Sequence, residues 1–211
     1  MPSPQLKYEA EASTESEINL ALLDGLMSRR SVSPKRLVVP GPCEVEVRQI
    51  VAAALTAPDH CALRPWRFIQ ISGAARECLG DTFATIKARR DPSSSPDDLE
   101  RERARALTAP VLITIVARLT IGHPRVRVCE QHMSVGAAIQ NMLLCAHALG
   151  YGAKMVSGLK VLDPHLANVL GVGSNEQLAG FICLGTQAQP QRKPARPDVD
   201  DHLTIWSPST V

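Results

Sequence analysis

Aromatic residues and net charge are both scarce in this chain of 211 residues. Phe, Trp and Tyr make up 3% of it, and its formal net charge at pH 7 is +2. A nearly neutral chain generates no strong electrostatic field that would attract nucleic acid. No apolar run approaches the roughly 20 residues that a membrane helix requires, and residues 1–17 lack the apolar core of a secretory signal. We therefore expect a cytoplasmic protein that contacts neither nucleic acid nor a membrane.

Paired cysteines are also missing. The six cysteines, at positions 43, 61, 78, 129, 145 and 183, form no CxxC pair. Structural zinc sites and disulfide frameworks use clustered spacings. We expect buried or free thiols in a reducing compartment and no metal site. A thiol-based redox enzyme is disfavoured for the same reason.

The sequence carries none of the common motifs for phosphate cradling or hydrolysis. It has no GxGxxG after a predicted strand, no GxxxxGK[ST], no HExxH and no GxSxG. Dinucleotide-binding folds, P-loop proteins, zinc peptidases and serine hydrolases depend on those spacings. The sequence therefore gives no support to these classes of function.

The chain does have the composition of a folded globular domain. Hydrophobic residues make up 45% of it and charged residues 21%, an ordinary balance for a protein with a core. At roughly 150 residues per domain, the length allows one or two domains. Since its low-complexity stretches are too short for an interdomain linker, we predict a flexible extension over 1–17 and a single domain over 18–211.

Helices and strands are interleaved along the chain without a strict βαβ rhythm. A capping box at Thr14 and Glu17 predicts a first helix that ends before Pro34. Hydrophobic patterns predict helices over 44–55 and 129–149 and strands over 66–72, 111–117 and 178–185. Residues 74–90 also look helical, a densely charged helix follows over 99–107, and Asp163-Pro164 starts a short helix. This order predicts an α+β fold in which a sheet is flanked by helices.

Two segments suggest contact with a second surface. The helix over 129–149 is apolar or small on most sides, which indicates a central helix or a subunit interface. The tail over 187–211 has many prolines and no helical stripe. We expect this tail to be extended, and it must lie on something to be ordered.

Three segments could carry chemistry. Arg29–Ser33 follows the first helix, where its guanidinium and hydroxyl groups could clamp a phosphate or simply complement the helix dipole. His60 lies on the turn before a strand, where site residues often lie, whereas Trp66 is expected to anchor the core. A late strand ends in Gly185-Thr186, where the backbone could approach a ligand closely or form a plain turn.

In this order the segments resemble the flavin-dependent nitroreductases. That family places Arg-Arg-Ser after the first helix, an APxxxxxxPW segment before the first strand, a long central helix ending in Gly-x-Gly, and a late GxxxLGT. The corresponding residues here are Arg29–Ser31, 57–66, 129–152 and 180–186. The resemblance covers about residues 18–197, and Ala-Pro-Asp-His is similar to a compact bacterial branch. It implies a three-layer sandwich with a mostly antiparallel central sheet, and a C-terminal tail that wraps a dimer partner.

The resemblance also implies a bound FMN. Arg29 and Ser31 would hold its phosphate and ribityl chain, and Arg30 would lie near its ring. The implied FMN-binding residues are Arg29, Arg30, Ser31, Ser33, Thr56, His60, Arg64, Met155, Val156, Ser157, Gly158, Gly185, Thr186, Arg192 and Arg196. Two places depart from the family pattern: Met155-Val156 stands in place of Trp-Arg, and Ala62 and Arg64 stand where Asn and Gln are common.

The implied activity is transfer of a hydride from NAD(P)H through FMN to nitroaromatic, quinone or similar electron-poor acceptors. The flavin, rather than a side chain, carries the hydride, and Arg29, Arg30 or Arg64 would stabilise its reduced ring. The residues implied for NAD(P)H are Cys145, Ala146, His147, Ala148, Leu149 and Gly150. The family implies a homodimer with flavin at the subunit interface. Two alternatives stay open: a non-catalytic flavin-binding or redox-sensing dimer, and a flavin dehydrogenase or reductive dehalogenase with a dedicated substrate.

Overall fold

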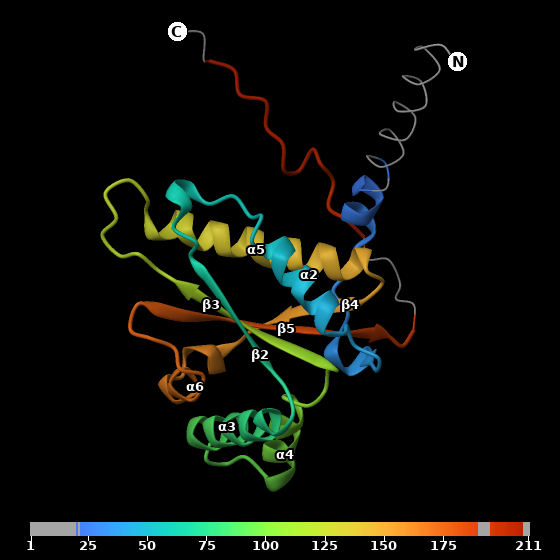
Figure 1. The fold of residues 1–211 in the computed structure, drawn as a ribbon, viewed down its shortest axis with the longest axis vertical. Coiled ribbons are helices and arrows are strands. Elements are labelled where there is room, and N and C mark those ends of the chain that lie inside the picture. Colours follow the sequence, from blue (N-terminus) through green and yellow to red (C-terminus); the bar gives the residue numbers. More distant parts are fainter. Residues whose placement is uncertain (1–19, 21, 190–194, 209–211) are drawn as a thin grey trace.

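The computed structural model describes residue 20, residues 22–189 and residues 195–208 (Figure 1). The predicted extension over 1–17 and the predicted helix start at Thr14 therefore lie outside the described residues. A helical segment over 22–28 precedes a short 3-10 helix, Pro34–Arg36. None of the described helices is long and apolar enough to cross a membrane.

A five-stranded antiparallel sheet forms the centre of the protein. In this sheet β5 is the central strand: it pairs with β3, with β4 and, near its C-terminal end, with β1. β2 pairs with β3 and is the edge strand of the described sheet. The strands are β1 (Leu37–Val38), β2 (Trp66–Ile71), β3 (Val111–Arg118), β4 (Gly152–Val156) and β5 (Glu176–Gln187).

Helices cover both faces of this sheet, as Figure 1 shows. α2 packs on α5 over one face, and α3 packs on α4 and α6 over the other. The predicted α+β fold, a three-layer sandwich with an antiparallel central sheet, is thereby confirmed. The helices are α2 (Glu44–Ala54), α3 (Ala74–Arg90), α4 (Pro96–Ala104), α5 (Val128–Ala148) and α6 (Pro164–Val169).

Alternate strand residues divide the core into two clusters. On β3, Ile113 and Ile115 belong to the cluster under α2 and α5, whereas Leu112 and Val116 belong to the cluster under α3 and α6. A strand that is buried on both faces reads as a continuous apolar run. This explains why the sequence predicts β3 within one residue of its observed end.

Two strands and one helix start differ from the sequence expectation. β1 has only two residues, and β4 is a short run directly after a helix, so neither has a pattern that predicts a strand. Gly152 opens β4 because a Cβ there would lie 2.7 Å from Cδ2 of Leu37. α4 begins at Pro96 rather than near Leu99, since Ser95 caps it.

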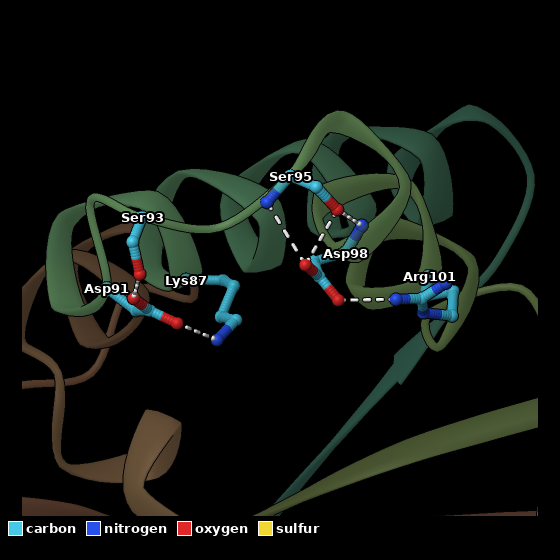
Figure 2. Close-up of polar contacts among 6 residues, drawn as sticks. All are labelled: Lys87, Asp91, Ser93, Ser95, Asp98 and Arg101. Carbon is cyan, nitrogen blue, oxygen red and sulfur yellow. Dashed lines mark hydrogen bonds and ion pairs between the residues drawn. The ribbon is translucent and has the colours of Figure 1, made fainter.

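Polar side chains fix the connection between α3 and α4 (Figure 2). The Asp98 amide donates to Ser95 Oγ at 3.2 Å, and the Ser95 amide donates back to Asp98 Oδ2 at 3.0 Å, which is a capping box. Lys87 and Ser93 each donate to Asp91 at 2.6 Å. The hydrogen bond from Lys87 is the main cause that holds the pKa of Asp91 below its usual range.

Candidate functional site

The residues Arg29–Ser33 form an elbow that is attached to β4. The Val32 amide donates to the Ala153 carbonyl at 3.0 Å, and Ser31 forms a parallel β-bridge with Ala153. Val32 is buried in the core, whereas Arg29 and Arg30 are half-buried. The elbow is therefore held beside the strand that carries Met155 and Val156, as the predicted FMN contacts require.

Three arginines gather at this elbow. Nη2 of Arg196, from the C-terminal tail, donates to the carbonyls of Met27 at 3.4 Å and Arg29 at 3.1 Å. Burial lowers the pKa of Arg29, and the charges of Arg196 and Arg30 lower it further. The Nη1 atoms of Arg29 and Arg30 are buried without a hydrogen-bond partner among the described residues. Because unpaired buried donors cost free energy, the cluster is suited to an anion with several acceptor oxygens, such as phosphate.

A cavity of about 400 Å³ opens next to the elbow, on the α3 and α4 side of the sheet. Ser33 and Ser157, both predicted from the sequence, line it, and Phe83 and Phe181 give it an apolar floor. Those two rings meet edge to face with centroids 5.6 Å apart. An apolar floor with a few polar groups on the wall is typical of a cofactor site.

The wall of this cavity is basic, and its cations differ from those that the sequence predicts. The expected cations beside a flavin ring are two arginines of the elbow or Arg64. Among the described residues, the charged side chains that line the cavity are all cationic: Lys35, Lys154, Lys160 and Arg105. Sequence reasoning missed all four, because they come from four separate segments that only the fold brings together.

Two glycines with positive φ shape the end of β4. Gly158 has φ 128° and Gly180 has φ 146°, a region that side-chain-bearing residues rarely adopt. A Cβ on Gly180 would lie 2.5 Å from the Val156 carbonyl oxygen. These glycines let β5 approach the turn after β4 closely, so that Val156 and Ser157 reach the cavity wall.

Gly185 and Thr186 lie where β5 meets β1. A Cβ on Gly185 would lie 2.7 Å from Cδ of Pro110, and the Thr186 hydroxyl donates to the Pro40 carbonyl at 2.6 Å. Both residues thus make contacts within the fold. A ligand contact at either one stays a prediction.

The predicted flavin contact His60 lies far from the elbow, whereas Thr56 accepts a hydrogen bond from Asn141, in the second half of α5, at 3.1 Å. His60 Nδ1 is 3.1 Å from Glu130 Oε2, near the start of α5, whereas Ser28, beside the elbow, bonds to His147 near the end of α5 at 3.0 Å. Positions 130 and 147 are about 25 Å apart at 1.5 Å per helical residue. The chain therefore does not bring His60 to its own elbow.

The loop that carries His60 has a strained backbone. Cys61, Ala62 and Arg64 have φ values of 64°, 51° and 50°, and the Arg64 amide donates to Asp59 Oδ2 at 2.6 Å. A left-handed conformation costs roughly 1–2 kcal/mol for such residues, and strain of this kind gathers at functional sites. Trp66, just after the loop, is 7% exposed and packs in the core, as the sequence predicts.

The remaining predicted contacts are dispersed. Within the segment predicted for NAD(P)H, residues 145–150, Ala146 is fully buried, whereas Leu149 and Gly150 are exposed. Arg192 lies outside the described residues, so Arg196 is the tail arginine with a described position. Within the part of the chain that the structure describes, no group of three or more His, Cys, Asp or Glu could hold a metal ion.

The family model described as "Nitroreductase family" matches residues 26–186, which is most of the chain. The chain belongs to the nitroreductase family. It is 34% identical over 173 residues to YdjA of Escherichia coli (strain K12), a protein provisionally named an NAD(P)H nitroreductase. That match covers 81% of this chain and 89% of YdjA. The family resemblance of the four sequence motifs is thereby confirmed.

Solved structures share the fold of this nitroreductase-family protein. A nitroreductase-like family protein from Bacillus cereus matches it with a TM-score of 0.72 at 20% identity, over 87% of this chain and 95% of that one. A Desulfovibrio desulfuricans protein, provisionally named a nitroreductase and solved in complex with FMN, matches with a TM-score of 0.65 at 24% identity. That match covers 89% of this chain and 98% of the other.

Proposed function

We propose that this chain is an FMN-dependent oxidoreductase that uses NAD(P)H. The observation that carries the proposal is the pair of buried, unpartnered guanidinium nitrogens of Arg29 and Arg30, for which a phosphate would supply acceptors. Family membership and the FMN complex of the Desulfovibrio protein support the choice of cofactor. Bound FMN supplies two-electron chemistry, taking a hydride from NAD(P)H and passing the electrons to a nitroaromatic, a quinone or a similar electron-poor acceptor.

The residues of the chain would bind and orient the cofactor. Arg29, Arg30 and Arg196 would hold the phosphate, and Ser31 and Ser33 the ribityl chain. The ring would lie in the adjoining cavity of about 400 Å³, against the turn Met155–Gly158. Fixed cations on the wall would favour the negative charge of the reduced ring, because such charges need no rearrangement when the electrons arrive.

We further infer a homodimer, in which a second copy completes the site. Since His60 lies about 25 Å along α5 from its own elbow, both can contact one flavin only across a subunit interface. Exposed apolar side chains are typical of such interfaces. They gather on the helical segment 22–28 and on the C-terminal tail: Leu22, Leu23, Leu26, Met27, Val199, Leu203, Ile205 and Trp206. The single-domain boundaries over 18–211 stay a prediction.

The phosphate clamp is tested by comparing FMN with riboflavin, which lacks the phosphate. Arg29→Ala is expected to weaken FMN binding roughly ten- to a hundredfold, since hydrogen bonds to a charged partner are worth about 1.5–3 kcal/mol. Riboflavin binding should change little in the same variant. Fluorescence titration of the apoprotein measures both affinities.

Arg48→Ala is the matched control, because Arg48 is an exposed arginine on α2 that pairs with Glu44 at 3.1 Å. We expect it to bind FMN like the parent protein. Equal losses of FMN and riboflavin affinity in Arg29→Ala would place the phosphate elsewhere. A purified protein that stays colourless after incubation with FMN would overturn the proposed function as a whole.

Turnover separates an enzyme from a non-catalytic flavin binder. The expected result is that NAD(P)H bleaches the flavin absorbance without oxygen and that a nitroaromatic or quinone restores it. Steady oxidation of NAD(P)H in the presence of the acceptor should follow. A yellow protein that never oxidises NAD(P)H would favour the redox-sensing alternative.

The dimer is tested by removing the tail. Deletion of residues 187–211 is expected to lower both the dimer fraction, measured by light scattering, and the retention of FMN. Since the deletion also removes Arg196, the full-length variant Arg196→Ala is the control: it should lose FMN affinity and remain dimeric. A truncated protein that stays dimeric and flavin-loaded would refute the role of the tail.

A further inference from the structure

A partly buried ion pair lies at the boundary between two cavities. Lys160 Nζ bonds to Glu102 Oε1, and the two side chains are 16% and 13% exposed. The ammonium group lies 3.9 Å from the centroid of the Phe83 ring. Lys160 lines both the cavity of about 400 Å³ and a neighbouring one of about 300 Å³, and Glu102 lines the second. Lys160 therefore belongs to the wall that the two cavities share, and Glu102 holds it from the side of the second cavity.

Glu102 is shared by two cations. Its Oε2 lies 3.2 Å from Nε of Arg105, while its Oε1 accepts from Lys160. Burial lowers the pKa of Lys160, the bond to Glu102 opposes that change, and the charges of Arg105 and Arg90 add to it. One carboxylate between two cations leaves an excess of one positive charge beside the cavity, where a partly buried wall focuses its field.

We propose that Lys160 and Glu102 form a charge couple that sets the reduction potential of a flavin held in the adjoining cavity. Lys160 stabilises the reduced ring, and Glu102 limits that stabilisation by neutralising part of the charge. The inference rests on the proposed function, namely that the 400 Å³ cavity takes the flavin ring.

The physical reason lies in the charge that the ring gains. When a hydride from NAD(P)H adds two electrons and one proton to the neutral oxidised ring, NAD(P)⁺ leaves and the ring carries a net negative charge. A fixed cation beside the ring then binds the reduced form more tightly than the oxidised form. The ratio of those two affinities determines how far the protein shifts the potential.

The couple also explains how α4 is held against the sheet. No residue of α4 is fully buried, yet the Glu102 side chain reaches inward to Lys160, on the turn after β4. A helix whose exposed face is charged thus contributes one acidic group to the wall. Substitution at Glu102 is expected to act on the cofactor through Lys160, so Glu102 is a positioning residue.

The test is a reductive titration of the FMN-loaded protein, followed by absorbance against a reference dye. Lys160→Met removes the charge and keeps most of the side-chain length. We expect it to weaken binding of reduced relative to oxidised flavin about tenfold, which lowers a two-electron midpoint by about 30 mV. Glu102→Gln is expected to shift the midpoint in the opposite direction. Lys160→Arg keeps the charge and should stay close to the parent value.

Arg67→Met is the matched control. It removes the cation from a comparable ion pair, Arg67 with Glu176 at 2.6 Å, whose side chains are 30% and 12% exposed and which does not line either cavity. It should leave the midpoint unchanged. An unchanged midpoint in Lys160→Met, or shifts of the same sign in Lys160→Met and Glu102→Gln, would overturn the inference.

Failure of the proposed function and failure of the charge couple give different experimental results. Should Lys160→Met not fold, the Glu102→Gln midpoint decides: an upward shift supports the couple and an unchanged value overturns it. If the parent protein does not bind FMN, the proposed function fails. If the parent binds FMN with a phosphate-dependent affinity and the midpoints do not respond, only the charge couple fails.

Discussion

Two helices on opposite faces of the sheet, α5 and α4, are held in place by different forces. On one face, α5 buries seven residues, which include Ala138 and Met142 at 0% exposure. On the other face, α4 buries none and is fastened by charged groups, such as Glu102 to Lys160 and Arg103 to Asp81. Helix α5 is therefore held by close apolar packing, whereas α4 is held by ion pairs and hydrogen bonds at the outside of a face whose apolar cluster is covered by α3 and α6.

Folding stability and ligand binding therefore depend mainly on different faces of the sheet. The cavity of about 400 Å³, with its four cations, lies on the α3 and α4 face, the charged face, whereas the larger of the two apolar clusters lies under α2 and α5. Burial of apolar side chains is the largest stabilising term, and it does not depend on a ligand. Burying charged side chains costs more free energy than burying apolar ones, but charged side chains can bind an anion and tune the reduction potential of a cofactor.

The strongest way to test this separation is to weaken the apolar face alone. Met142→Ala leaves a cavity between α5 and the sheet, where Met142 is fully buried. Such substitutions cost about 2–5 kcal/mol, and we expect a loss in this range by chemical denaturation. FMN affinity of the folded protein should stay at the parent value. If FMN affinity falls as well, the two faces are coupled.

A smaller effect is expected from the charged face. Arg76, on α3, donates to the Ala106 carbonyl at 2.9 and 2.5 Å and to the Pro110 carbonyl at 3.0 Å. Burial lowers the pKa of Arg76. Arg76→Leu leaves those carbonyls without their donors, which costs about 1–3 kcal/mol.

Unlike Met142→Ala, this change should also affect the cavity. Thr108 lies within the turn that Arg76 holds, Arg105 directly precedes that turn, and both residues line the cavity. Hydrogen exchange over residues 104–110 is expected to accelerate, and FMN affinity to fall. Unchanged exchange in that segment would show that Arg76 does not fix the turn.

The same difference explains what the sequence could and could not predict of the fold. α2, α3, α5, β3 and β5 are correctly predicted because each has a long apolar pattern with the period of its secondary structure. β4 has only five residues, Gly-Ala-Lys-Met-Val, too few for a clear strand pattern, so its strand character comes from pairing with β5. α4 has few apolar residues, and its start was set by the Ser95 cap rather than by hydrophobic periodicity.

The candidate site shows the same limit. The elbow and the turn Met155–Gly158 are contiguous motifs, so the family resemblance locates them, and the structure brings them together. No local sequence pattern marks Lys160 or Arg105 as site residues. Their role depends on Glu102 and on a cavity formed by distant segments of the chain. The distance between His60 and the elbow follows from the length of α5. A short sequence motif cannot predict that distance.

The helix cap of α4 offers a milder perturbation of the charged face. Ser95→Ala removes the acceptor for the Asp98 amide in Figure 2, and loss of such a cap costs about 1 kcal/mol. The loss should be confined to α4, visible as faster hydrogen exchange of its first turn. Thr85→Ala is the control, since its hydroxyl bonds to the Asp81 carbonyl within α3 and should matter little. Equal losses of stability in the two variants would show that the Ser95 cap contributes no more than an ordinary side-chain hydrogen bond.

The smallest expected effect is a change in the stability of α4 at acidic pH. Hydrogen bonds from Ser95 and Arg101 lower the pKa of Asp98 from 3.8 to about 2. Because the folded pKa lies below the unfolded one, ionised Asp98 stabilises α4 fully above about pH 4 and loses that effect as the pH falls through about 2. The difference in stability between the parent and Asp98→Asn should therefore shrink over this range, whereas Met142→Ala should keep a constant offset because no proton is involved. A pH-independent difference for Asp98→Asn would mean that its carboxylate does not hold the helix, and that α4 stays in place through its other ion pairs, Glu102 with Lys160 and Arg103 with Asp81.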